Sequence, residues 1–117
     1  MNQQFDQREF VRVPDCSDVI YQTASGKKKK SETKDISQTG ICFFAEEKPA
    51  IGDVIDITLA LERLGYSFAA KASVRWVNEI IKNRRYEVGV KFVDLPEQDI
   101  KRLLNYINSV KRLDRYR

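Results

Sequence analysis

Residues 35–44 read Asp-Ile-Ser-Gln-Thr-Gly-Ile-Cys-Phe-Phe, and the rest of the chain is interpreted outward from this stretch. Its second half, residues 40–44, is apolar on both faces, which predicts a central strand. Its first half runs from a strand into a turn. Asp35 and Ser37 are two residues apart, so on an extended backbone their side chains leave the same face. Gly40 allows φ > 0 or a close approach of the backbone to a ligand, and the three residues together predict a small polar platform.

The same turn also has a purely local interpretation, in which the Asp35 and Ser37 side chains bond their own backbone. Two arginines upstream favour a ligand site instead. Arg8 and Arg12 are four residues apart, and therefore share a side whether the chain is extended or helical. A guanidinium binds phosphate through two parallel hydrogen bonds and reads guanine O6 and N7 in the same way. Because a carboxylate accepts from the N1–H and N2–H₂ donors of guanine, the constellation predicts a ligand that carries guanine and phosphate.

These residues form a pattern that resembles a known signature. RxxxR followed about two dozen residues later by DxSxxG is similar to the signature of the PilZ domain, the bacterial receptor module for cyclic di-GMP. Residues 74–77 (VRWV) and 86–92 (YEVGVKF) resemble the later strands of that family, and a predicted helix closes the chain. The resemblance covers nearly all of the 117 residues.

The resemblance implies a role in second-messenger signalling and a role for each signature residue. Arg8 and Arg12 would grip phosphate and a guanine Hoogsteen edge, and Asp35 would accept from a guanine Watson–Crick edge. Ser37 would bond phosphate or base, and Gly40 would permit close backbone approach. Binding is expected to draw an N-terminal arm onto the domain and to pass that change to an unidentified effector protein.

Two positions depart from the commonest pattern of the family. Gln7 stands where many members carry a further arginine, and Thr39 stands where glycine is frequent. In the family the further arginine is associated with two stacked ligands, so Gln7 predicts one nucleotide per chain. Trp76 is interpreted most simply as core, although an indole at a rim could also stack on guanine.

The composition describes one globular domain. With 42% hydrophobic and 32% charged residues, 117 residues suffice for a single core. No apolar run approaches the length of a membrane span and the N-terminus is no signal peptide, which predicts a cytoplasmic protein. Cys16 and Cys42 lack metal-ligand spacing and are interpreted as reduced thiols. Without histidine or a nucleophile motif, the chain is predicted to be a binding module with no catalytic residue, metal or cofactor.

The net charge of +4 is distributed unevenly. Residues 101–117 carry six basic residues and one acid, so the rest of the chain sums to −1. A nucleic-acid surface is therefore not indicated. The run Lys27 to Lys30 could contact phosphate or an anionic lipid surface, but such a run is more often the solvated tip or edge of a hairpin.

Alternating hydrophobicity predicts an all-β dominated fold, a six-stranded antiparallel PilZ-like β-barrel with one C-terminal α-helix. A single domain of residues 1–117 is expected, with a flexible arm at 1–14 that carries RxxxR, the barrel at 15–93 and the helix at 96–112. In the long strand Phe68, Ala70, Ala72, Val74 and Trp76 are expected to share the inner face. The predicted strands are residues 19–23, 32–37, 40–44, 53–62, 66–77 and 85–93.

Two other functions are open at this point. The first is a protein-binding adaptor without nucleotide, as in family members that lack the signature; the intact Arg8, Arg12, Asp35, Ser37 and Gly40 argue against it. The second is a barrel that binds RNA or single strands. That function needs aromatic residues spaced along one sheet face, and the sequence has no such series.

Overall fold

The computed structural model describes residues 12–23, 25–61 and 64–115, with side chains as far as Lys111. In these described residues seven strands precede one long helix, α2. No helix in these ranges is long and apolar enough to cross a membrane. The elements are β1 (Val13–Pro14), β2 (Asp18–Gln22), β3 (Lys28–Ile36), β4 (Gly40–Ala45), β5 (Val54–Leu61), β6 (Tyr66–Ile81), β7 (Arg85–Val93) and α2 (Glu97–Arg115).

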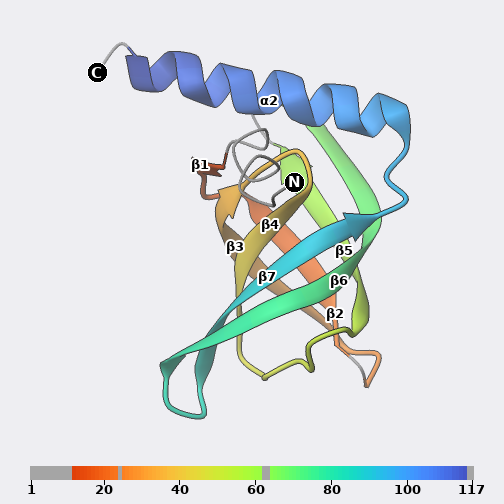
Figure 1. Cartoon of the computed structure of the whole chain (residues 1–117), viewed down its shortest axis with the longest axis vertical. Helices are drawn as coiled ribbons and strands as arrows, with labels where there is room; N and C mark the ends of the chain where they lie inside the picture. Colours follow the sequence, from red (N-terminus) through yellow and green to blue (C-terminus); the bar gives the residue numbers. More distant parts are fainter. Residues whose placement is uncertain (1–11, 24, 62–63, 116–117) are drawn as a thin grey trace, which may run out of the picture.

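Six of these strands close into a barrel (Figure 1). The order β3-β2-β5-β6-β7-β4 returns to β3 through an additional β3–β4 pairing, and every pairing is antiparallel. The predicted six-stranded antiparallel barrel with one C-terminal helix is therefore confirmed. The two-residue β1 adds to β3 through Val13↔Ile36 and Pro14↔Asp35. Val13 is buried, so this end of the expected arm belongs to the sheet.

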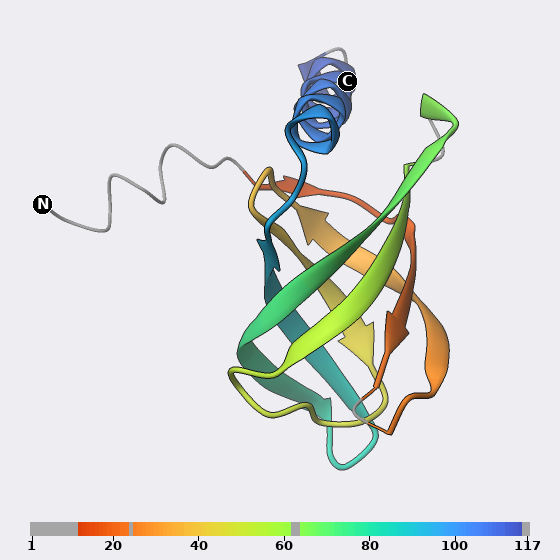
Figure 2. The ribbon, with the colours of Figure 1, turned by 90° about the vertical axis from the view of Figure 1, so that its right-hand side faces the viewer.

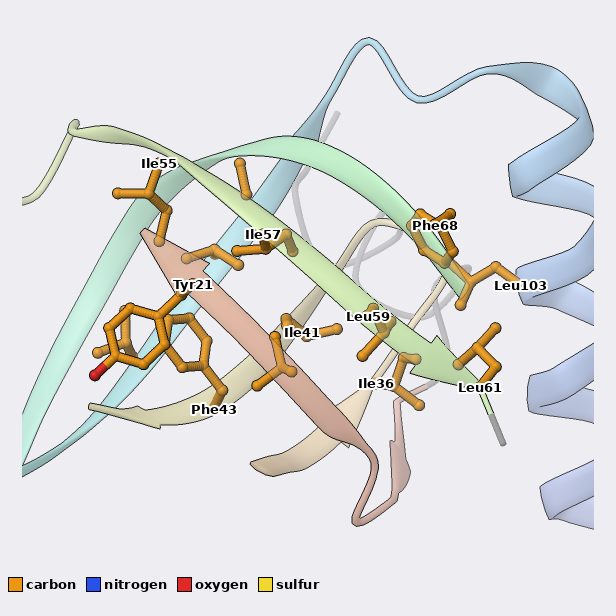
Figure 3. Packing of buried hydrophobic residues seen from close by; sticks show 14 of the residues in the cluster. Tyr21, Ile36, Ile41, Phe43, Ile55, Ile57, Leu59, Leu61, Phe68 and Leu103 are labelled. Carbon is orange, nitrogen blue, oxygen red and sulfur yellow. The ribbon is translucent and has the colours of Figure 1, made fainter. Parts of the chain in front are cut away.

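Alternation along the strands places the core inside the barrel (Figure 3). In β5 every second side chain, from Ile55 to Leu61, faces inward, as the period of two predicts. Ile41 and Phe43 of β4 lie opposite, and the Phe43 ring packs 5.0 Å from that of Tyr21. The rigidity of this core holds the strands that carry the predicted site residues.

Helix α2 lies across one end of the barrel (Figures 1 and 2). Pro96 precedes it, and Glu97 and Asp99 provide negative charge in its first turn. Leu103 inserts beside Leu61 at the end of the core (Figure 3). The predicted plug of the barrel is confirmed, and the helix continues to Arg115, three residues further than expected.

A buried polar cluster joins α2 to the segment between β1 and β2. The Tyr106 hydroxyl donates to Asp15 Oδ1 over 2.6 Å and lies 3.1 Å from the Ser17 hydroxyl. Thr33 Oγ1 donates to the Asp15 carbonyl oxygen over 2.8 Å and accepts from the Ser17 backbone N–H over 2.9 Å. These four side chains form what we call the buried cluster. It fixes the chain three residues after Arg12 to the helix.

The expected inward position of Trp76 is wrong. The β6–β7 register shifts between Val74 and Trp76, so that Arg75 is an extra residue in a β-bulge. Because side chains alternate with a period of two, one inserted residue moves every later side chain to the opposite face. Val74 is fully buried, whereas Trp76 lies on the outer face with 42% of its surface exposed.

The lysine run lies near the β2–β3 turn, in agreement with the hairpin interpretation. Gly26, at φ 89°, forms the turn, and Lys28 to Lys30 begin β3 opposite Gln22, Tyr21 and Ile20. The second strand therefore begins four residues earlier than predicted. Cross-strand pairing rather than β-propensity stabilises this lysine-rich segment.

Candidate functional site

Arg12, Asp35 and Ser37 meet on the outer face beside β1. Arg12 Nε donates to Asp35 Oδ1 over 3.0 Å, and Arg12 Nη1 donates to the Ser37 hydroxyl over 3.3 Å. The Arg12 side chain remains 41% exposed, because it lies on top of the other two. In the sequence, Arg12 lies 23 positions before Asp35 and 25 positions before Ser37. We call these three residues the exposed cluster.

The local sequence explains the position of Ser37. Its backbone N–H donates to the Gly40 carbonyl over 2.9 Å, and its hydroxyl lies 3.2 Å from that of Thr39 and accepts from the Thr39 N–H over 3.3 Å. Ser37 therefore does bond its own turn, as the local interpretation expected, and it is fully buried. The described contacts of Asp35 are different, since its carboxylate binds Arg12.

Gly40 is needed for a reason that the sequence did not reveal. Its φ is not positive, so the left-handed alternative is wrong. A Cβ at this position would lie 1.9 Å from the Val90 carbonyl oxygen and 3.1 Å from Lys91 Cα. The missing side chain lets β4 lie close against β7, and this contact holds the end of the turn in place.

One row of cross-strand partners crosses the outer face from Asp35 to Trp76. Asp35 pairs with Cys42, Cys42 with Gly89 and Gly89 with Trp76. Directly opposed residues share a face of the sheet, and three strand spacings amount to roughly 14 Å. Because Gly89 has no side chain, the indole lies over it: a Cβ there would be 2.2 Å from Trp76 Nε1. The row forms a floor with a carboxylate at one side and an aromatic ring at the other.

Cys42 lies in the middle of this floor, between Asp35 and Gly89. It is fully buried although it lies on the outer face, and burial, with a further contribution from Asp35, raises the pKa of its thiol to about 12. A thiol with this pKa stays protonated and is a poor nucleophile near neutral pH. Cys42 is therefore a packing residue.

An ion pair between Lys34 of β3 and Glu87 of β7 lies beside this row. Lys34 Nζ lies 2.7 Å from Oε2 of Glu87, which is largely buried, and the hydrogen bond to Glu87 raises the pKa of Lys34. Sequence reasoning missed both residues. Glu87 lies among apolar residues of β7. The alternation of that strand places Glu87 on the outer face, and this was the signal that its carboxylate needs a cationic partner.

The structure brings together four of the predicted site residues and leaves two undescribed. Arg12, Asp35, Ser37 and Gly40 lie at one turn, and Trp76 lies on the same outer face at the far side of the row. Arg8 and Gln7 lie outside the described residues. The contacts of the pair Arg8 and Arg12 with a common ligand therefore remain a prediction.

Comparison with solved structures supports the fold. The Bacillus subtilis inhibitor of motility MotI/DgrA superposes with a TM-score of 0.78 at 19% identity, over 94% of this chain and 53% of that one. YcgR of Escherichia coli in complex with c-di-GMP gives a TM-score of 0.78 at 18% identity, over 94% and 48%. The chain thus spans about half the length of these two proteins. The c-di-GMP-bound PilZ domain of YcgR alone gives 0.74 at 19% identity, over 94% and 95%.

Comparison of the sequence itself gives the family. Among curated protein sequences, none matches this chain at a significant level. The sequence profile described as the PilZ domain matches residues 6–109, which include both halves of the signature, the barrel and most of α2. The chain therefore belongs to the PilZ domain family.

Proposed function

We propose that this protein is a cyclic di-GMP receptor that signals to a partner protein, and that Arg12 and Asp35 are central to its nucleotide site. The observation that carries the proposal is the Arg12 guanidinium, held by two side chains yet open to solvent. Such a preorganised fork loses little conformational entropy when an anion binds. The family and the nucleotide complexes of YcgR support the choice of ligand.

Arg12 keeps hydrogen-bonding capacity for a ligand. A guanidinium has five N–H donors, and the described contacts of Arg12 use one on Nε and one on Nη1. The remaining three suit a phosphate oxygen pair or the O6 and N7 atoms of guanine. Ser37, which is buried under Arg12, acts in this proposal chiefly as a positioning residue.

Asp35 and Trp76 would hold the guanine from two directions. Asp35 Oδ1 accepts from Arg12, which leaves Oδ2 to accept from the guanine Watson–Crick edge. Trp76, at the far side of the row, offers an exposed indole on which a base can stack. Because Gly89 has no side chain, that ring lies directly over the sheet at this position.

Charge balance favours one nucleotide per chain. Cyclic di-GMP carries two phosphodiester charges, and Arg8 with Arg12 supplies two guanidinium groups, while Gln7 adds none. Two stacked ligands would bring four negative charges together and repel each other. Lys91, exposed on the outer face opposite Gly40, and Arg75 at the bulge are two further cations of this face, beside Lys34, which is paired with Glu87.

The buried cluster offers a route from the nucleotide to a partner protein. Arg12 is followed directly by β1, and Asp15 after β1 accepts from Tyr106 of α2. Ligand binding that shifts Arg12 would therefore change the segment to which α2 is fixed. In this proposal the partner recognises the altered position of the arm against the helix.

Titration calorimetry with cyclic di-GMP tests the proposal, with GTP and linear pGpG as controls. The parent should bind one cyclic di-GMP per chain, and Arg12→Ala should weaken binding by roughly 1.5–3 kcal/mol, or about one to two decades in Kd. Lys101→Ala, which removes a cation from the exposed face of α2, should bind like the parent. A folded parent that binds no cyclic di-GMP would favour the nucleotide-free adaptor, and an unchanged Arg12→Ala would refute the assigned site.

A further inference from the structure

The end of the barrel opposite α2 is built from three loops (Figures 1 and 2). They are the β2–β3 turn, the β4–β5 loop and the β6–β7 hairpin. We call the surface formed by residues 23, 25–30, 46–53 and 79–85 the distal end. Its parts lie side by side, because one hollow is lined by Thr23 and Lys48, and a second by Lys30, Glu46 and Arg84.

The distal end is basic. Its three segments contain eight lysines and arginines against four acids, a net charge of +4. Lys29 is neutralised by Glu46 at 2.9 Å and Glu47 at 3.8 Å. Within the described part of the chain, the other cations of the distal end form no ion pair. They are Lys27, Lys28, Lys30, Lys48, Lys82, Arg84 and Arg85.

Large apolar side chains are exposed among these cations. Ile51 of the β4–β5 loop is 70% exposed, and Ile80 and Ile81 of the β6–β7 hairpin are each 46% exposed. Residues 101–117 carry a similar charge but differ in this respect. As far as Lys111, α2 has no large apolar side chain in the exposed class. Cations and exposed isoleucines therefore coincide at the distal end.

A hollow of about 300 Å³ lies between the cations of β3 and those of the hairpin. Lys30, Arg84 and Arg85 line it together with Ile81, Phe44 and Glu46, whose carboxylate is paired with Lys29. Arg85 lies over the Phe44 ring at 4.4 Å, which fixes its guanidinium at the wall. Three cations around an open hollow suit a phosphate group, and the apolar wall suits the carbon atoms attached to it.

We propose that the distal end binds the surface of an anionic lipid bilayer. The cations face the headgroups, one phosphate occupies the hollow, and Ile51, Ile80 and Ile81 enter the boundary between headgroups and acyl chains. Ile51 lies on the β4–β5 loop, and Ile80 and Ile81 end β6 where the β6–β7 hairpin begins. Both segments lie at the end of the barrel opposite α2 (Figure 1), an arrangement that fits a broad, soft surface. An acidic protein partner would instead place its apolar side chains in the hollow beside Lys48, but Ile51 and Ile80 line neither hollow of the distal end.

Cosedimentation with phosphatidylglycerol/phosphatidylcholine vesicles tests this proposal, with pure phosphatidylcholine vesicles as the uncharged arm. The parent should bind the anionic vesicles alone, and binding should weaken at high salt. Lys82→Gln/Arg84→Gln should weaken it about 25-fold, at about fivefold for each cation removed. Ile80→Ser/Ile81→Ser, which keeps every charge, should weaken it roughly tenfold or more.

The matched control is Lys101→Gln/Lys111→Gln, which removes the same charge from α2 and should bind vesicles like the parent. Circular dichroism and cyclic di-GMP titration establish that each variant is folded. Equal loss in the control and in Lys82→Gln/Arg84→Gln would overturn the proposal, since it would show attraction by net charge alone. A parent that binds soluble polyglutamate but no vesicles would overturn it in favour of an acidic protein partner.

Discussion

The two polar clusters beside β1 both draw on residues 12–17 and 33–37, with Tyr106 of α2 added to the buried cluster, but they have opposite properties. In the buried cluster Asp15, Ser17 and Thr33 bond one another and Tyr106. No described buried side-chain polar atom lacks a partner. In the exposed cluster Arg12 binds Asp35 and keeps donors directed to solvent.

This difference indicates that the two clusters have different roles, one in stability and the other in binding. Saturated, buried hydrogen bonds stabilise the fold but have nothing left to offer a ligand. An exposed ion pair contributes little to stability, and its spare donors are available for binding. Changes in the buried cluster should therefore alter stability, and changes in the exposed cluster should alter affinity.

The largest effect is expected for Asp15→Ala. It removes the carboxylate that accepts from the Tyr106 and Ser17 hydroxyls, and should lower the free energy of unfolding by roughly 3 kcal/mol, because two buried hydrogen bonds to a charged group are lost. Urea denaturation measures it, with exposed Asp18→Ala as the control that should change stability little. Calorimetry on the folded Asp15→Ala protein should give nearly the parental affinity. A stable variant with lost affinity would reverse the roles of the two clusters.

The second-largest effect is the loss of stability when either of two glycines on the outer face is replaced by alanine. Gly40→Ala should cost roughly 2–3 kcal/mol, because its Cβ would meet the backbone of Val90, which cannot move without breaking the sheet. Gly89→Ala should cost roughly 1 kcal/mol, since its Cβ would meet the exposed ring of Trp76, which can rotate away. Only Gly89→Ala should shift the fluorescence of the single tryptophan. Equal costs would contradict the assigned contacts.

Asp35→Ala breaks the exposed cluster directly. The affinity for cyclic di-GMP should fall by about one to two decades, while the free energy of unfolding should change by less than about 1 kcal/mol. Calorimetry and urea denaturation on the same variant give both values. Asp56→Ala removes one carboxylate of an exposed ion pair on β5 and β6 and should leave affinity unchanged. A large loss of stability in Asp35→Ala would show that the two clusters are not distinct.

Much of the fold and part of the site could be predicted from the sequence, because both depend on local spacing. The alternation in β5 and the helical stripe of α2 follow from the periods of strand and helix. The position of Trp76 could not be predicted, since a single-residue bulge at Arg75 reverses the alternation. The buried cluster could not be predicted either, because Asp15 and Tyr106 are 91 positions apart and no local pattern links them.

The smallest effect is the pH dependence of stability that Cys42 causes. This residue lies between the buried core and the solvent-exposed site. Its thiol pKa is raised from 9.0 to about 12 in the folded protein, so the unfolded chain loses this proton first as pH rises. The resulting stability is present below pH 9 and is lost as pH rises toward 12. At pH 10 the loss should be on the order of 1 kcal/mol relative to neutral pH. Urea denaturation of the parent and of Cys42→Ala isolates this term, because lysines and tyrosines titrate alike in both. Parallel curves would mean that water reaches the thiol, and that the floor between Asp35 and Trp76 is open rather than packed.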